Sequence, residues 1–114
     1  MSDKALNLFT IGQGKAIPVD HGGPASYTSG GETFGNNNVM TGISTLGLGS
    51  LDCVIGGPSL TGNYFVYAIP SGKGECKTFK LVWVTATTGI PTTTQVTAAV
   101  NLSAETVRLL VIGR

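Results

Sequence analysis

The fold is decided by residues 63–84, which read NYFVYAIPSGKGECKTFKLVWV. Aromatic and β-branched residues dominate positions 63–69, and Pro70 ends that run. A five-residue loop with two glycines then leads into a second run at 76–84. Two β-prone runs joined by a short glycine-containing loop are typical of a β-hairpin, so we expect a hairpin here.

The alternation of the second run predicts which side of the hairpin is buried. Phe79, Leu81 and Trp83 share one face of an extended strand, because successive side chains point to opposite sides. We expect this face to form the core and to pack against three residues of the first run: Phe65, Tyr67 and Ile69. Trp83 and Tyr64 could instead form a sugar-stacking platform, but a mid-strand tryptophan favours core packing. Tyr64 lies on the opposite face and is a candidate exposed contact.

Shorter β-prone runs flank this hairpin on both sides. We expect strands at 16–19, 39–43, 51–55, 92–100 and 105–112. Pro18 has no backbone N–H to donate, which predicts an edge position for the first of these strands. The last run is strongly apolar, so we expect it to lie inside a sheet or beneath a partner.

The strand pattern as a whole predicts the fold class. About eight short strands at intervals of roughly ten residues, with no convincing helix, are typical of an all-β sandwich of the jelly-roll kind. A chain of 114 residues suits one domain and can bury a core without disulfides or a metal. We therefore expect residues 1–114 to form a single β-sandwich, with 1–11 as an extended N-terminal arm or an edge strand.

Charge is the most unusual feature of the composition. Charged residues make up 11% of the chain, with a net charge of +1, whereas a typical soluble domain carries about 25%. Nucleic-acid binding needs a dense cationic face, so we expect none. We also expect no membrane span, since no apolar run reaches the required length, and no secretory signal. A surface solvated by Thr, Ser and Asn suits a protein that other proteins cover.

Residues that could support catalysis are sparse. Asp20 and His21 are adjacent, so in an extended segment they point to opposite sides and cannot form a Ser-His-Asp arrangement. We expect His21 to be a loop residue. The six acidic residues occur singly, and a glycosidase cleft would need more aromatic and acidic residues than this chain has.

Motifs for cofactors and metals also fail. Residues 12–15, Gly-Gln-Gly-Lys, lack the first glycine, the Ser/Thr and the helix of a phosphate-binding loop. Cys53 and Cys76 are too few and too far apart for a zinc site, and we expect two small thiols in or near the core. The sequence therefore predicts no enzymatic activity, no cofactor and no bound metal.

A long stretch of weak pattern supplies candidate contact residues. Residues 20–38 are rich in Gly, Ser and Asn, and long loops in compact domains are often functional or mobile. The candidate protein contacts are residues of this loop, of the N-terminal arm and of the hairpin: Leu6, Leu8, Phe9, Tyr27, Phe34, Asn37 and Tyr64. The simpler alternatives are an ordinary edge strand for the arm and a merely mobile loop.

In composition and strand pattern the chain resembles the small head-decoration (cement) proteins of tailed bacteriophages. The resemblance is carried by the strand, turn and return strand at 62–85 and by the closing RLLVIGR of 108–114. It implies a homo-oligomer, with a trimer favoured over a dimer, that braces the major capsid protein on the outer surface of the virion after synthesis in the host cytoplasm. It assigns no individual functional residue. The alternative is a carbohydrate- or receptor-binding β-module of a phage tail or fibre.

Overall fold

The computed structural model describes residues 4–5, 9–11, 14–35, 48–74, 76–87 and 90–114. All regular structure in this part of the chain is β-strand. The described residues form nine strands: β1 (Lys4–Ala5), β2 (Phe9–Ile11), β3 (Gly14–Gly22), β4 (Glu32–Gly35), β5 (Leu51–Ile55), β6 (Tyr64–Pro70), β7 (Thr78–Thr87), β8 (Ile90–Gln95) and β9 (Thr106–Gly113).

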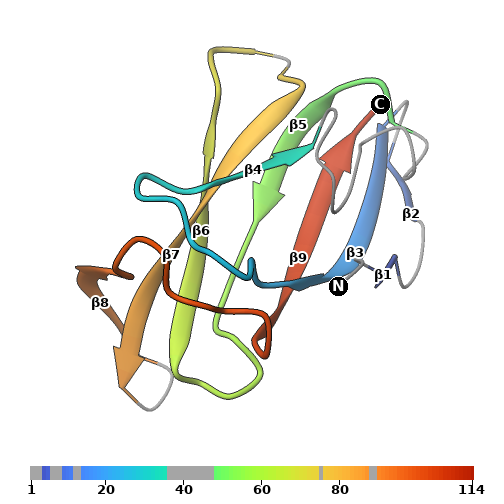
Figure 1. Ribbon diagram of the computed structural model, residues 1–114. Coiled ribbons are helices and arrows are strands. Elements are labelled where there is room, and N and C mark those ends of the chain that lie inside the picture. The colour runs from blue at the N-terminus through green and yellow to red at the C-terminus, as the bar shows by residue number, and fades with distance from the viewer. Residues whose placement is uncertain (1–3, 6–8, 12–13, 36–47, 75, 88–89) are drawn as a thin grey trace.

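The strands form two antiparallel sheets that pack face to face (Figure 1). In the first sheet β9 lies between β3 and β5, and β1 and β2 both pair with β3. In the second sheet β7 pairs with β4, β6 and β8. β3 and β5 belong to the first sheet and β4 and β6 to the second, so the chain crosses to the other sheet at each of these steps. In each sheet a later strand lies between two earlier ones: β9 lies between β3 and β5, and β7 lies between β4 and β6. The predicted all-β sandwich is confirmed.

The hairpin formed by β6 and β7 is confirmed, and so is the inward face of β7. Phe79, Leu81 and Trp83 are buried. The face of β6 that the sequence predicts to pack against them is wrong, however, because Tyr67 and Ile69 are each 45% exposed. Directly paired residues share a face of a sheet, and the register pairs Trp83 with Val66 and Leu81 with Ala68. The inward residues of β6 are therefore Tyr64, Val66 and Ala68.

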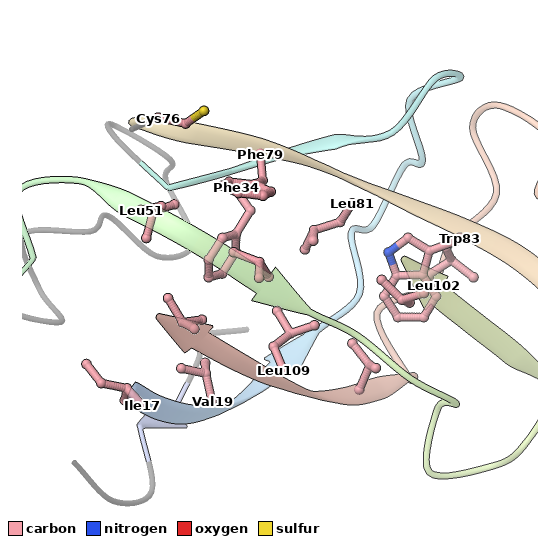
Figure 2. Packing of buried hydrophobic residues seen from close by; sticks show 14 of the residues in the cluster. Ile17, Val19, Phe34, Leu51, Cys76, Phe79, Leu81, Trp83, Leu102 and Leu109 are labelled. Carbon is pink, nitrogen blue, oxygen red and sulfur yellow. The ribbon is translucent and has the colours of Figure 1, made fainter. Parts of the chain in front are cut away.

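The core lies between the two sheets and receives side chains from both. Figure 2 shows Phe34, Phe79 and Leu81 approaching from one side and Val19 and Leu109 from the other. All five are at most 4% exposed. Burying a side chain of this size contributes about 1.5–3 kcal/mol relative to leaving it in water. The contacts between the sheets therefore supply the main stabilisation of the fold.

The position of β3 corrects the prediction of an edge strand at Pro18. β3 is an interior strand, with β9 on one side and β1 and β2 on the other. Pro18 is tolerated because of the register. β1 pairs at Val19 and Asp20, and β2 pairs at Ala16 and the two residues before it, so the proline lies between the two short ladders. Its missing N–H therefore removes no hydrogen bond from either of them.

Several other sequence expectations can now be compared with the structure. The interior position expected for 105–112 is confirmed by β9. The strand at 51–55 is confirmed by β5, whereas β8 covers only part of the strand expected at 92–100. The expectation of a long loop at 20–38 is wrong where β3 continues to Gly22 and where β4 spans Glu32–Gly35, and residues 36–38 lie outside the described residues. The strand expected at 39–43 lies outside the described residues.

Candidate functional site

The first candidate site is a polar cluster buried between the sheets. His21 of β3 and Glu32 of β4 form a 2.6 Å hydrogen bond between Nε2 and Oε1, and Trp83 of β7 donates its indole N–H to the same carboxylate oxygen at 2.9 Å. His21 and Trp83 are fully buried, and Glu32 is 8% exposed. The expectation that His21 is a loop residue is wrong. The alternation Ile17, Val19, His21 places its imidazole on the inward face of β3.

The burial of this cluster decides what it can do. Asp20 points to the opposite side of β3, as expected, and its carboxylate pairs with the Arg108 guanidinium at 2.8 Å on the exposed outer face. His21 is thus separated from its neighbouring acid and from solvent, and the Phe34 ring packs edge-on against the imidazole at 5.6 Å. A side chain without solvent access cannot meet a substrate. The cluster therefore links three strands of the core and is not a catalytic site.

Tyr27 and Phe34 are core residues, so their assignment as surface contacts is wrong. Tyr27 is 2% exposed and Phe34 is fully buried. The Tyr27 hydroxyl donates to Gln95 Oε1 at 3.0 Å and accepts from the Trp83 backbone N–H at 3.2 Å. Desolvation by burial raises the pKa of Tyr27 above its ordinary value of 10.0. Backbone hydrogen bonds to Val100 and Ala99 hold the segment around Tyr27 against the sandwich.

The remaining predicted contact residues have different positions. Tyr64 lies on the inward face of β6, is half-buried, and packs edge-on against Trp83 with a 6.2 Å ring separation, so its predicted outward face is wrong. Phe9 belongs to β2, where its backbone pairs with Ala16, so of the two alternatives for the N-terminal segment the structure shows edge strands. The other three lie outside the described residues: Leu6, Leu8 and Asn37.

Apolar side chains cover much of the outer surface of both sheets. In the first sheet the register aligns Pro18, Leu110 and Ile55 in one outward row, and Ile55 is 50% exposed. In the second sheet the outward side chains of β6 are Phe65, Tyr67 and Ile69, and they lie beside Val82 and Val84 of β7. We call Leu110, Ile55, Tyr67 and Ile69 the outer apolar surface. An apolar outer face is unusual for a free monomer and is typical of a surface that other proteins contact.

The two sheets approach each other where β5 ends. The backbone of Gly56, next to Ile55, lies so close to β6 that a Cβ atom there would be 2.2 Å from the Val66 carbonyl oxygen and 3.6 Å from the Tyr67 nitrogen. Val66 N–H donates to the Gly57 carbonyl oxygen at 2.9 Å. The end of β5 therefore adjoins the middle of β6.

An open hollow of about 660 Å³ lies at the other end of this junction. Its lining comes from the start of β5, the end of β9 and the loop after β6: Asp52, Pro70, Gly72, Lys73, Gly74 and Arg114. Arg114 Nε lies 3.3 Å from Asp52 Oδ2. The volume suits a small ligand or a few side chains of a partner. The charged lining side chains carry two positive charges and one negative.

Side chains that could bind a metal ion are not clustered in the described part of the chain. No cluster of three or more His, Cys, Asp or Glu side chains occurs among the described residues. Both cysteines are free thiols, with Cys76 buried and Cys53 half-buried, as the sequence predicts. None of the described residues belongs to a helix with the length and apolar character needed to cross a membrane.

Comparison of the chain with protein-family models, with curated proteins and with solved structures gave no match. The function is therefore argued from the outer apolar surface and the hollow beside it. Sequence reasoning missed Ile55, Tyr67 and Ile69 as surface residues. The available signal was that residues 64–69 are apolar or aromatic at every position, so one of the two faces of β6 had to be exposed or covered by another protein.

Proposed function

We propose that this chain is a structural virion protein that decorates and stabilises a phage capsid by bridging major capsid subunits on the outer surface of the shell. The observation that carries the proposal is the outer apolar surface, in which Ile55, Tyr67 and Ile69 are each 45–50% exposed. The low charge of the chain and its resemblance to decoration proteins support the same function.

The energetics of such a surface favour bridging. Burial of apolar surface contributes about 25 cal/mol per Å², and aromatic residues such as Tyr67 are frequent anchors of interfaces. A decoration protein that contacts two shell subunits makes its second contact at high effective concentration, so modest interfaces give tight overall binding. Exposed apolar side chains lie on the outer faces of both sheets, which would let one molecule contact two neighbouring subunits.

Self-association is part of this proposal. A net charge of +1 means that copies placed side by side repel one another weakly. A trimer is favoured over a dimer because the resemblance is to proteins that occupy symmetry axes of a shell. The molecular mass of the purified protein in solution, measured by sedimentation equilibrium, tests this point directly.

The test of the proposal is co-sedimentation with expanded heads built from the major capsid protein of the same genome. We expect stoichiometric binding of the unmodified chain and strongly reduced binding of the double variant Tyr67→Ser/Ile69→Thr. Leu60→Ser is the matched control, because Leu60 is 73% exposed and lies in the turn between β5 and β6, outside the outer apolar surface. Absence of binding by the unmodified chain, or unchanged binding of the double variant, would overturn the proposal.

A carbohydrate- or receptor-binding module of a phage tail or fibre is the second candidate. It is favoured by the exposed Tyr67 ring and by the hollow whose lining includes Asp52. An exposed aromatic ring can stack on a sugar, and a carboxylate can accept hydrogen bonds from its hydroxyl groups. Binding to a glycan array that is lost in Tyr67→Ser, together with no binding to heads, would establish this function instead.

A further inference from the structure

The hydrogen bonds of β6 show which of its backbone groups are free. Ala86 N–H donates to the Asn63 carbonyl oxygen and Ser71 N–H donates to the Thr78 carbonyl oxygen. In an antiparallel ladder hydrogen-bonded pairs alternate with non-bonded pairs, so the odd-numbered residues of β6 bond to β7. The even-numbered residues present their N–H and C=O groups to the opposite side, where β5 ends.

Two of these even-numbered residues already have partners. The Tyr64 carbonyl oxygen accepts from Ser59 N–H at 2.8 Å, and Val66 N–H donates to the Gly57 carbonyl oxygen at 2.9 Å. The next is Ala68. Its N–H and C=O face the same side, and within the described part of the chain neither group has a hydrogen-bond partner. Ala68 is half-buried, so part of this residue is accessible to solvent.

The surroundings of Ala68 define what could bind there. Tyr67 and Ile69 flank it, point outward and are each 45% exposed. The hollow begins two residues further along β6, at Pro70, and contains Lys73, for which no carboxylate partner occurs among the described residues. Residues 67–73 therefore bring together a backbone edge group that can pair with another chain, two apolar side chains on either side of it and a cation.

We propose that an extended segment of the partner protein adds to the edge of β6 at Ala68 and places an acidic side chain in the hollow against Lys73. This inference rests on the proposed function and specifies how the shell protein is held. In such strand addition the backbone hydrogen bonds supply affinity and the side chains supply specificity. Residues of the segment on either side of the one paired with Ala68 would lie beside Tyr67 and Ile69.

A second copy of β6 fits this edge less well than a segment from another protein. Two β6 strands paired antiparallel about Ala68 would place Val66 opposite Pro70. The Val66 N–H is already bonded to Gly57, and Pro70 has no N–H to donate. A pairing between copies would thus gain hydrogen bonds at Ala68 alone, whereas a foreign segment can also use the hollow.

The test measures hydrogen–deuterium exchange of the Ala68 amide in the chain bound to expanded heads and in the free chain. We expect exchange at Ala68 to slow by at least several-fold on binding. Lys73→Glu should weaken binding several-fold, whereas Lys77→Glu, an exposed lysine outside the lining of the hollow, should leave it unchanged. Ala68→Pro, which removes only the outward N–H of this strand, should weaken binding relative to Ala68→Ser.

The outcomes separate this inference from the proposed function. Stoichiometric binding with unchanged exchange at Ala68 would overturn the inference and leave decoration standing. Failure of the unmodified chain to bind heads would overturn both. If circular dichroism shows that Ala68→Pro does not fold, the exchange measurement and the pair Lys73→Glu and Lys77→Glu still decide the question.

Discussion

Replacement of Glu32 by alanine tests the assignment of the buried polar cluster. The carboxylate oxygen of Glu32 is the shared hydrogen-bond partner of the His21 imidazole and of the Trp83 indole N–H. Glu32→Ala would leave both rings without that partner at positions that water does not reach. Each buried polar group that loses its partner costs about 1–3 kcal/mol.

The expected loss is therefore large on the scale of the whole fold. Removing one partner of a buried pair typically costs about 3–5 kcal/mol, and the total stability of a domain is about 5–15 kcal/mol. We expect Glu32→Ala to lose about 3–5 kcal/mol of unfolding free energy. Glu32→Gln keeps an acceptor oxygen, so its loss should be smaller.

The measurement is urea unfolding followed by both circular dichroism and the fluorescence of Trp83, the only tryptophan in the chain. Asp20→Ala is the matched control, since it removes the acidic partner of an ion pair on the outer face whose Arg108 side chain is 59% exposed. Water screens that pair, so the loss should be much smaller. Equal losses for Glu32→Ala and Asp20→Ala would refute the structural importance of the buried cluster.

Three further predictions follow from burial and close packing. Phe34→Ala should lower the free energy of unfolding in urea by about 3–5 kcal/mol, because it empties a fully buried site. Leu60→Ala, at a 73% exposed site, should change this free energy by less than about 0.5 kcal/mol. Equal effects of the two variants would contradict the core position of Phe34. The contribution of Tyr27 to the unfolding free energy should be constant below pH 10.0 and should fall as the pH rises through the raised pKa of its hydroxyl, because the unfolded chain loses this proton first. Tyr27→Phe should remove this alkaline decline in stability, and an unchanged pH profile of the variant would refute the assignment. Gly56→Ala should destabilise the chain by about 1–3 kcal/mol because its Cβ would collide with a carbonyl oxygen of β6, while Gly57→Ala, which has open space around its Cβ position, should not; thermal unfolding of the two variants separates them.

The strand alternation of β7 was enough to predict its inward face, because only one of its two faces carries the largest apolar residues. The same reasoning failed for β6. Residues 64–69 are apolar or aromatic on both faces, so alternation alone does not say which side is buried. The decision is made by the pairing register with β7, which places Val66 opposite Trp83 and leaves Tyr67 exposed. Register depends on contacts distant in sequence and is not encoded in either strand alone.

The buried polar cluster shows the same limit. Ile17, Val19 and His21 occupy alternate positions of one strand, and this period predicts that the imidazole faces inward with the two apolar side chains. Its partner could not be predicted in the same way. Glu32 is eleven residues away and lies in the other sheet, and Trp83 is brought to it by a third strand. Such a pairing follows from how the sheets are stacked, which a single sequence does not specify.

The cluster and the outer apolar surface are connected through β7. The Trp83 indole N–H donates to the Glu32 carboxylate, and the Trp83 backbone N–H donates to the Tyr27 hydroxyl. Val66 of β6 is the residue directly opposite Trp83 in the pairing of the two strands. Buried polar groups that are fully hydrogen-bonded favour one arrangement of the strands over slipped alternatives. A one-residue slip of β6 along β7 would turn Tyr67 and Ile69 into the core and Val66 outward. The buried cluster therefore fixes the inward face of β7, and the pairing of Val66 with Trp83 on that strand sets the register that leaves Tyr67 and Ile69 exposed.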